Sequence, residues 1–600
     1  MTYQEFLTTK IAVAPISGFD ITDADVNPVL KPHQRDSVKW AIAGGRRAIF
    51  AKFGLGKTVM ELEFCRIVTE KLGGCALITL PLGVKQEFTR DAVNILGWKE
   101  APPYVRTMAE VKACGNKIML TNYERVRDGD IDLSYFKAAC LDEAAVLRSY
   151  GSEIYQTFLP KFAGVEYKLV ATAVPSPNRY KELIHYAGFL EIMDTGQALT
   201  RFFKRDSTKA NNLTLYPHME EQFWLWVSSW ALFLTKPSDL GYSDEGYDLP
   251  PLEIRHHKIC NNGETTVDRD GQIKLMRETS SSLPDAAAEK RNSIDARVKV
   301  AREIVEASPD DHFVIWHDLN KELDTIQREI PGAMGIKGEK MSLELREQRT
   351  IDFSEGKFRI LATKKSLSGS GCNFQHHCHR AIFVGIDHKF HDFIQAVHRL
   401  YRFLQSETVI VDIIYTEAEA EILQALKDKW KRHDEMAEKM QCIVKQYGLV
   451  SNAVYELSRK MGVERIEITG NYYTAVNNDC VEELARMPDN SMDLWHTSIP
   501  FGNHYEYTAN YNDFGYNKDT EEFFRQLDFL TPHVLRTLQP GRVLAVHVKD
   551  RVLFGNATGT GMPTIEPFHS YCIEHYMRHG FQFFGMITVV TDVVRENNQT

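Results

Sequence analysis

A glycine-containing segment near the N-terminus has the residue types and spacing that bind phosphate. The segment AKFGLGKT, Ala51 to Thr58, follows the apolar run AIF and precedes the helical stretch VMELEFCRIV. Gly54 and Gly56 let backbone N–H groups point at phosphate oxygens, Lys57 supplies a positive charge, and the Thr58 hydroxyl can bind Mg2+. Ala51 stands where the usual pattern has its first glycine, so the interpretation depends on the residues that follow.

Two acids and two arginines further along the chain could complete a site for nucleotide hydrolysis. LDEA, which contains Asp142 and Glu143, closes the apolar run KAAC, so both acids are expected at the end of a strand. There Asp142 can hold Mg2+, directly or through water, and Glu143 can orient the attacking water. In QAVHRLYRFLQ, Arg399 and Arg402 are three residues apart, so on a helix they share one face and could both reach a γ-phosphate. Taken alone, the acids could be a solvated turn and the arginines a solvated helix face.

The elements expected around these residues define an α/β fold. Short apolar runs alternate with helix-length intervals from about residue 30 to 190, and the pattern returns near 312 to 415. The runs are RRAIFAKF, CALITLPL, KIMLTNY, KAACLDEA and YKLVATAV, then DHFVIWHD, FRILATKK, HRAIFVGID and TVIVDIIY. Such a pattern is typical of parallel sheets that are covered on both faces. We therefore predict two parallel-sheet lobes, with the phosphate-binding loop in the first and the arginine pair in the second.

Over about residues 28 to 425 these segments resemble the superfamily 2 helicases, and among them the Swi/Snf-like translocases. LKPHQ with Gln34 is similar to the family's adenine-reading segment, and GLGKT is similar to its phosphate loop. The other matches are LTNYERV (120–126) beside the DNA track, ATAVPSPN (171–178, with Thr172) for coupling, and SGSGCNF (368–374) and QAVHRLYRFLQ (395–405) as the last two motifs.

The resemblance implies two RecA-like lobes, with ATP and Mg2+ in the cleft between them and double-stranded DNA across both. It also implies that Arg399 and Arg402 complete the site only when the lobes close, which couples hydrolysis to stepping. Swi/Snf-like motors typically move on duplex without unwinding it, and the character of the last motif speaks against an RNA helicase. Ala145, where many helicases have His, and Leu404, where Swi/Snf-like proteins usually have Gly, bear on coupling rather than on hydrolysis.

A third α/β segment, from about residue 471 onward, carries a different set of groups. Asp479 stands at an expected strand end, a helix follows, and the strand MDLWHT leads to the motif SIPF. This order resembles the DNA amino-methyltransferases, which modify an exocyclic amine of adenine or cytosine. The resemblance implies that Ser498 orients the amine of a flipped base, that Phe501 stacks on the base, and that Asp479 belongs to the cofactor side. Ile499 departs from the family pattern, which has Pro at that position.

The methyl donor of that family, S-adenosylmethionine, binds at a glycine-rich FxGxG turn that we do not find in this sequence. GNATGTG (555–561) lacks the acidic-strand context, and in the family order that begins with a SIPF-type motif the turn would lie beyond Thr600. We therefore expect a partial Rossmann-like methyltransferase domain that binds S-adenosylmethionine only if the chain extends past Thr600. The alternative is that residues 471–600 are a non-catalytic DNA-binding module that positions the motor.

Composition limits the class of protein further. The 600 residues are 43 % apolar, which supports several buried cores. A net charge of −10 leaves room for DNA contact only through local Lys/Arg clusters. No apolar run approaches the roughly 18 residues that span a bilayer. The 10 cysteines fit a reducing compartment. We interpret the segment GCNFQHHCH (371–379) as a loop rather than a metal site. We expect a cytoplasmic protein without membrane contact. We expect it to act in a DNA modification or restriction system of a phage or mobile element, with possible restriction or modification subunits as partners.

The predicted organisation has five parts. They are a first RecA-like lobe with the phosphate-binding loop (1–190), an inter-lobe helical or irregular insertion (191–290), a second RecA-like lobe (291–425), a helical linker (426–470), and the N-terminal part of a DNA amino-methyltransferase domain (471–600). EQFWLWVSSWALF in the insertion could offer a base-stacking surface, but its spacing favours an amphipathic helix buried against a lobe. Residues 416–446 contain neither Gly nor Pro and predict one or two long helices that form a stalk.

Overall fold

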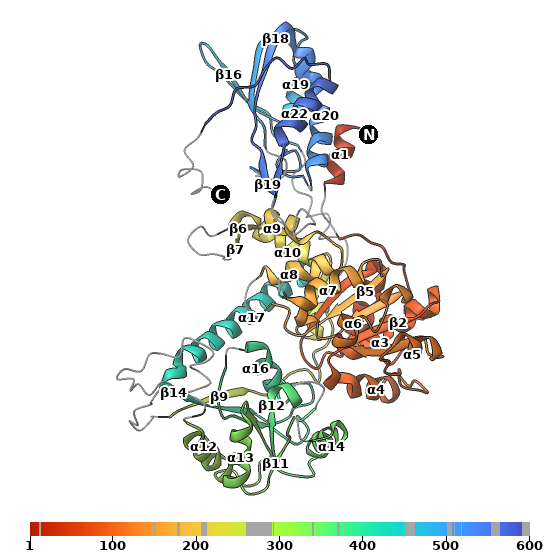
Figure 1. The fold of residues 1–600 in the computed structure, drawn as a ribbon, viewed down its shortest axis with the longest axis vertical. Helices are drawn as coiled ribbons and strands as arrows, with labels where there is room; N and C mark the ends of the chain where they lie inside the picture. Colours follow the sequence, from red (N-terminus) through yellow and green to blue (C-terminus); the bar gives the residue numbers. More distant parts are fainter. Residues whose placement is uncertain are drawn as a thin grey trace. The chain divides into compact units, whose positions relative to one another are not determined.

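The computed structural model divides the chain into two compact units, and each is described by itself (Figure 1). One unit, here called the two-lobed unit, comprises Pro15–Glu191 and Trp230–Leu449, and the other, the C-terminal unit, comprises Met1–Ala14, Ile192–Ser229 and Val450–Thr600. The structure describes all residues except 11–13, 149–151, 177–179, 206–212, 260–290, 292, 339–340, 369–372, 388, 448, 450–461, 501–506, 509, 518, 554–563 and 591–600.

The first lobe is built on a parallel sheet of six strands in the order β3-β2-β4-β5-β1-β8. The strands are β1 (Arg46–Ala51), β2 (Ala76–Leu80), β3 (Ile118–Asn122), β4 (Ala138–Leu141), β5 (Tyr167–Ala171) and β8 (Ala231–Leu234). The helices are α2 (Pro32–Gly44), α3 (Lys57–Leu72), α4 (Lys85–Asn94), α5 (Met108–Ala113), α6 (Tyr123–Asp128), α7 (Glu153–Phe162) and α8 (Glu182–Phe189). α3 packs on α2, α4, β2 and β4, so the strand–loop–helix β1–α3 sits in the middle of the lobe.

The second lobe repeats this architecture with a parallel sheet in the order β11-β12-β10-β13-β14-β9. The strands are β9 (Leu252–Ile259), β10 (Phe313–His317), β11 (Ala333–Gly335), β12 (Ile360–Lys364), β13 (Arg380–Phe383) and β14 (Val409–Thr416). The helices are α12 (Ile294–Glu306), α13 (Asn320–Glu329), α14 (Leu343–Ser354), α15 (Lys365–Ser368) and α16 (Phe390–Val397). The prediction of two parallel-sheet α/β lobes of the RecA-like kind is confirmed, and all nine apolar runs that predicted strands contain one.

The structure groups the stretch 191–290 differently from the predicted insertion. Within it, the apolar ALFL forms β8 at the edge of the first sheet, and Leu252–Ile259 forms β9, which pairs with β14 along its whole length at the edge of the second sheet. The aromatic part forms α10 (Glu220–Ser228), whose Phe223 and Trp226 are buried against Phe202. The expectation of a buried helix is confirmed, but this helix belongs to the C-terminal unit and not to a lobe.

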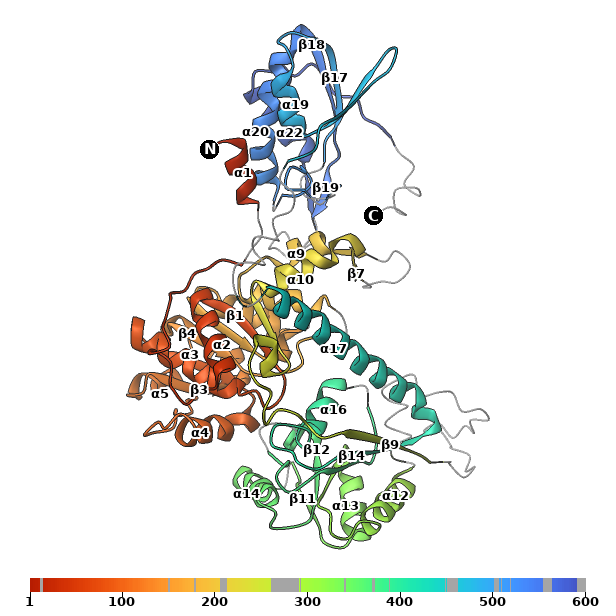
Figure 2. The same cartoon turned by 180° about the vertical axis from the view of Figure 1, so that it is seen from behind.

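The long charged segment forms one helix, α17 (Ala420–Tyr447), which connects the two lobes (Figure 2). Its first turns place Ile422 and Leu426 in the core of the second lobe. Its later turns pack on β8 and on the short helix η5 (Pro237–Leu240) of the first lobe, where Gln441 contacts Asp239. The long helix was predicted, but its expected role as a stalk was wrong, because both of its ends are packed against lobes.

The C-terminal unit contains the parallel strand pair β17 (Met492–Ser498) and β18 (Leu538–His547), and the helices α19 (Cys480–Arg486), α20 (Thr520–Thr537) and α22 (Phe568–Arg578). Three further strand pairs are β15 (Ile466–Thr469) with β16 (Thr474–Asn477), β19 (Arg551–Leu553) with β20 (Thr564–Glu566), and β6 (Phe203–Arg205) with β7 (Leu213–Leu215). Its remaining helices include α9 (Thr195–Phe202).

The first residues of the chain also belong to the C-terminal unit rather than to the first lobe, in which they were predicted. Helix α1 (Tyr3–Thr9) packs on α20, with the rings of Tyr3 and Phe6 about Phe529 at centroid distances of 5.4 and 5.5 Å. The Lys10 ammonium donates to Gln526 Oε1 over 2.9 Å. These contacts join segments that are about 500 residues apart, so no local sequence pattern could predict them. Across the described part of the chain, none of the helices has the length and apolar character needed to cross a membrane.

One buried ion pair in the second lobe gives a test of this packing. Arg297 on α12 and Glu419 are both fully buried, 2.7 Å apart, and the guanidinium also donates to the Val384 carbonyl. Arg297→Met leaves a buried carboxylate without its counter-charge, so we expect a loss of about 3–5 kcal/mol of stability. Urea unfolding followed by tryptophan fluorescence measures this as a lower midpoint.

The exposed pair Arg302–Glu306 on the same helix supplies the control. Arg302→Met should change stability by no more than about 0.5 kcal/mol, because exposed i,i+4 ion pairs contribute little. Equal midpoints for the two variants would contradict the assignment.

Candidate active site

The predicted phosphate-binding loop lies between β1 and α3. Gly54 and Gly56 have φ angles of +86° and +82°, in the left-handed region that L side chains rarely adopt. A Cβ at Gly54 would lie 2.8 Å from the Phe403 Cβ, and a Cβ at Gly56 would lie 2.2 Å from the Gln34 amide nitrogen. Both backbone conformation and space therefore require glycine at these two positions.

Gln34, on the first turn of α2, holds the loop from one side. Its amide nitrogen donates to the Leu55 carbonyl over 3.1 Å, and its amide oxygen accepts from the Lys31 N–H over 2.9 Å. The side chain predicted to read adenine thus also fixes the loop that is predicted to bind phosphate.

The two acids of LDEA follow β4 directly, as the sequence predicted for a strand end. Asp142 is 6 % exposed, and burial together with the neighbouring charge of Glu143 raises the pKa of its carboxyl to about 7. Glu143 has φ +48° and accepts a hydrogen bond of 2.9 Å from the Thr172 hydroxyl. The Tyr123 hydroxyl lies within hydrogen-bonding reach of the backbone carbonyls of both acids and can donate its one proton to either, which holds the turn.

Lys57 and Thr58 begin α3 beside these acids. The Lys57 ammonium donates to the Ala51 carbonyl over 3.0 Å. Burial lowers its pKa, whereas the charges of Glu143 and Asp142 oppose that shift. A hydroxyl at the helix start and a buried carboxylate at the strand end are oxygen ligands of the kind that Mg2+ prefers, so these residues fit the ion that the fold implies.

Glu61, one turn further along α3, is an acid that the sequence analysis did not single out. It is 1 % exposed, and burial and the charge of Asp142 raise its pKa well above the ordinary value. The signal in the sequence was an acid inside an otherwise apolar helix face.

The arginine pair of the second lobe does not lie on a helix, contrary to the expectation. α16 ends at Val397, and Arg399 and Arg402 occupy the turns that follow. The Arg402 guanidinium lies 3.7 Å from the carboxylate of Glu87, on α4 of the first lobe. Burial acts to raise the pKa of Glu87, but the charges of Arg402 and Arg399 outweigh it, and the net pKa lies below the ordinary value.

The same turns contact the phosphate-binding loop. The His398 ring stacks on Phe53 with centroids 4.5 Å apart and planes 19° apart, and burial lowers its pKa to about 3. The Lys31 ammonium lies 4.3 Å from the Phe403 ring centroid. A second histidine of this lobe, His391, places Nε2 3.4 Å from Glu143 Oε1. Residues from both lobes therefore surround the loop.

Leu404, the departure from the family glycine, has φ +70°. An L side chain in this region costs about 1–2 kcal/mol, which explains why glycine is favoured there. Leu404 is 55 % exposed, so the strain is not compensated by burial. Of the predicted motifs, Asn178 and residues 369–372 lie outside the described residues.

In the C-terminal unit, Asp479 forms hydrogen bonds with the start of α19 and with the N-terminal helix α1. Its Oδ1 accepts from the Val481 and Glu482 N–H groups as the N-cap of α19, and its Oδ2 accepts from the Tyr3 hydroxyl over 2.8 Å. Ser498 ends β17, with its Oγ 3.1 Å from His547 Nδ1 on the neighbouring strand. Phe501 and residues 555–561 lie outside the described residues.

Comparison with known proteins gives likenesses among solved structures. No protein-family model matches the chain. No curated protein matches it either. Among solved structures, the Sulfolobus solfataricus SWI2/SNF2 ATPase core in complex with dsDNA is similar at 15 % identity and a TM-score of 0.33. The match covers 71 % of this chain and 97 % of that one. The fold is thus defined by the two parallel sheets described above and not by this likeness.

The raised pKa of Asp142 predicts a pH-dependent stability. The unfolded-state value is about 4, so between about pH 4 and 7 the folded protein binds more proton than the unfolded chain, and this contribution to stability is lost as the pH rises through about 7. In the absence of Mg2+, Asp142→Asn should therefore melt a few degrees above the wild type at pH 8, roughly as for a gain of 1–2 kcal/mol. The difference should shrink at pH 5.5.

Differential scanning fluorimetry at the two pH values measures this effect. Glu100→Gln, at an exposed acid of the same lobe, is the control and should melt like the wild type at both values. If Asp142→Asn melted at or below the wild-type temperature at pH 8, Asp142 would not be a buried acid with a raised pKa.

Proposed function

We propose that this chain is a DNA-dependent ATPase of the two-lobed helicase and translocase kind. The observation that carries the proposal is the convergence of both lobes on the phosphate-binding loop. Arg402 lies beside Glu87, His398 stacks on Phe53, and His391 approaches Glu143. An ATP site between two lobes requires charged groups from each of them at this place.

Each residue has a distinct role in the proposed reaction. Gly54 and Gly56 free the backbone N–H groups for phosphate oxygens, and Lys57 supplies charge to the β- and γ-phosphates. Thr58 and Asp142 would hold Mg2+, which would neutralise charge on the phosphates. Glu143 then orients the attacking water.

The acids are positioned for their roles by neutral groups. The Thr172 hydroxyl holds one carboxylate oxygen of Glu143, and the Tyr123 hydroxyl fixes the turn that carries both acids. Thr172 thereby connects the water-positioning acid to the segment that follows β5. This is the contact through which hydrolysis would be coupled to movement of the lobes.

Arg399 and Arg402 supply the positive charge that the second lobe contributes. Their contact with Glu87 partly neutralises them, and the γ-phosphate would compete with Glu87 for the same guanidinium groups. Exchange of one anionic partner for another would change the contacts between the lobes. We propose double-stranded DNA as the polymer on which this change acts, because the motif order resembles that of the Swi/Snf-like translocases.

A finer part of the proposal concerns the C-terminal unit, which we propose to be part of a DNA amino-methyltransferase from a DNA modification or restriction system. Ser498 ends strand β17, which pairs in parallel with β18, so the motif follows a strand as the resemblance implies. The alternative is a DNA-binding module without methyl transfer. Labelling of the protein by S-adenosylmethionine separates the two, since a binding module would not be labelled.

The ATPase assignment is tested by removing charge and water positioning. Lys57→Ala and Glu143→Gln should each reduce DNA-stimulated phosphate release at least about 100-fold, because no neighbouring group replaces either function. Lys112→Ala, at an exposed lysine of α5, is the control and should hydrolyse ATP at the wild-type rate. Near-normal turnover by Lys57→Ala or by Glu143→Gln would refute the motor assignment.

The polymer is tested by comparing duplex DNA, single-stranded DNA and RNA at equal nucleotide concentration. Duplex DNA should stimulate phosphate release most. Binding should weaken about tenfold or more between 50 and 200 mM salt, because contacts to phosphates release counterions. Fluorescence anisotropy with labelled oligonucleotides and the Glu143→Gln protein measures affinity without turnover. Equal stimulation by RNA would contradict the proposal.

A further inference from the structure

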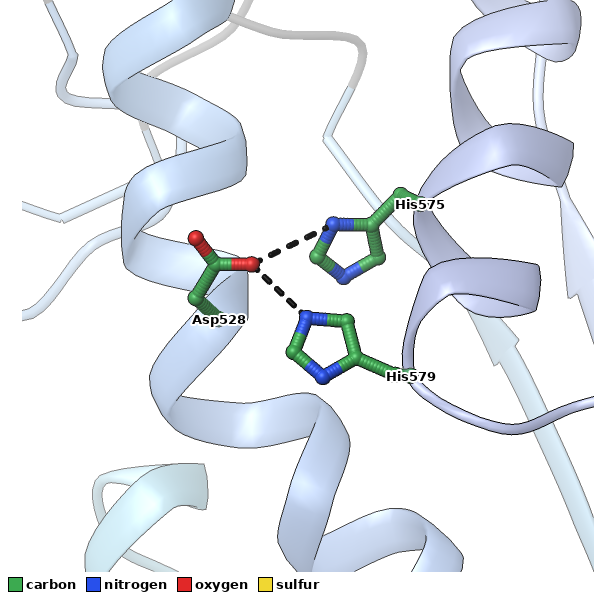
Figure 3. Close-up of side chains that lie close together, drawn as sticks. All are labelled: Asp528, His575 and His579. Carbon is green, nitrogen blue, oxygen red and sulfur yellow. Dashed lines mark hydrogen bonds and ion pairs between the residues drawn. The ribbon is translucent and has the colours of Figure 1, made fainter.

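Two histidines and an aspartate converge in the C-terminal unit, far from the residues discussed above in sequence. His575 lies on α22 and His579 directly follows this helix, four positions later, so both lie on the face toward α20. Asp528 on α20 points at both imidazole rings (Figure 3). A ligand atom from each of the three residues lies within 4.8 Å of those of the other two.

Hydrogen bonds fix the tautomer of His575. The Thr531 hydroxyl has one proton, which it donates to the Leu527 carbonyl over 2.9 Å. At 2.8 Å from His575 Nε2, the Thr531 oxygen must therefore accept, so Nε2 carries the imidazole proton. His575 is 3 % exposed. Its Nδ1 presents a lone pair.

The lone pair on His575 Nδ1 faces the carboxylate of Asp528, which is also an acceptor. His575 Nδ1 lies 3.6 Å from Asp528 Oδ1, and two acceptors at this distance require a positive group between or beside them. In the structure the positive group is the Arg578 guanidinium, 2.7 Å from Asp528 Oδ1 and 3.4 Å from His575 Nδ1. The Arg578 side chain is 62 % exposed, so it can move into solvent and leave its place to a cation.

The geometry points to a divalent transition-metal site, of the Zn2+ class, formed by Asp528, His575 and His579. Two imidazole nitrogens and one carboxylate suit Zn2+ and its neighbours rather than Mg2+ or Ca2+, which prefer oxygen ligands. Tetrahedral coordination with bonds of about 2.0–2.1 Å places ligand atoms about 3.4 Å apart. The observed Asp528–His575 and Asp528–His579 separations of 3.6 and 2.8 Å lie on either side of that value.

The surroundings support this ligand set. Metal-binding histidines usually donate their second N–H to a neighbouring acceptor, which is what His575 does toward Thr531. Asp528 and His579 are 39 % and 19 % exposed at their side chains, so an ion can enter from solvent. The metal would fasten α20 to α22, whose Phe523, Leu527 and Phe568 form the core of this unit.

The experiment uses the full chain after removal of metal with a chelator. Calorimetry with Zn2+ alone should show one site, Zn2+ should raise the melting temperature, and Co2+ should give the visible absorption of tetrahedral coordination. His579→Ala and Asp528→Asn should weaken binding at least about 100-fold and remove the Co2+ band. Both residues are partly exposed, so these variants are expected to fold.

Arg578→Ala separates the metal site from a purely ionic cluster. If Arg578 competes with the metal, its removal should tighten Zn2+ binding about tenfold, whereas in an ionic cluster it would only lower stability. Unchanged Zn2+ affinity in His579→Ala would overturn the proposal, since binding would then arise elsewhere. Absence of Zn2+ binding in both the wild type and Arg578→Ala would also overturn it.

Discussion

Close contact with the phosphate-binding loop is the constraint on which the two-lobed unit depends. Gly54 and Gly56 have no space for a Cβ. Phe403 of the second lobe lies against Gly54, and Gln34 on α2 of the first lobe lies against Gly56. Since Phe403 belongs to the second lobe, the shape of the loop and the arrangement of the lobes are set together. The two acids nearby differ in how far a positive neighbour offsets burial: Arg402 keeps the pKa of Glu87 below its ordinary value, whereas Lys57 does not offset the effect of burial and of Glu143 on the pKa of Asp142.

Much of the fold could be predicted from local patterns. Every apolar run used to predict a strand holds one, because strands buried on both faces need continuous apolar sequence. Three edge strands, β8, β9 and β11, were missed, and β8 and β9 were missed for different reasons. β8 follows directly on the aromatic run of α10, and β9 (LEIRHHKI) is half polar because it pairs on one side only. The docking of α1 on α20 leaves no local signal at all.

The site was predicted as a set of motifs but not as a geometry. The position of Lys57 could be predicted from the order strand, loop, helix, and that of Asp142 from the end of an apolar run. Both signals are local in the sequence. The turn that carries Arg399 and Arg402 could not be predicted, because it is held by a contact distant in sequence, the stacking of His398 on Phe53. Glu87 and His391 were missed for the same reason: their roles arise only when the lobes meet.

Helix α17 limits how the lobes can move. Its 28 residues make a rod of about 42 Å, and it contains neither Gly nor Pro to act as a hinge. One end is embedded in the second lobe and the other rests on β8 and η5, so the distance between its two anchorages is fixed. Movement of one lobe against the other would then be a rotation about the axis of this helix, or would need one of its two ends to leave its lobe.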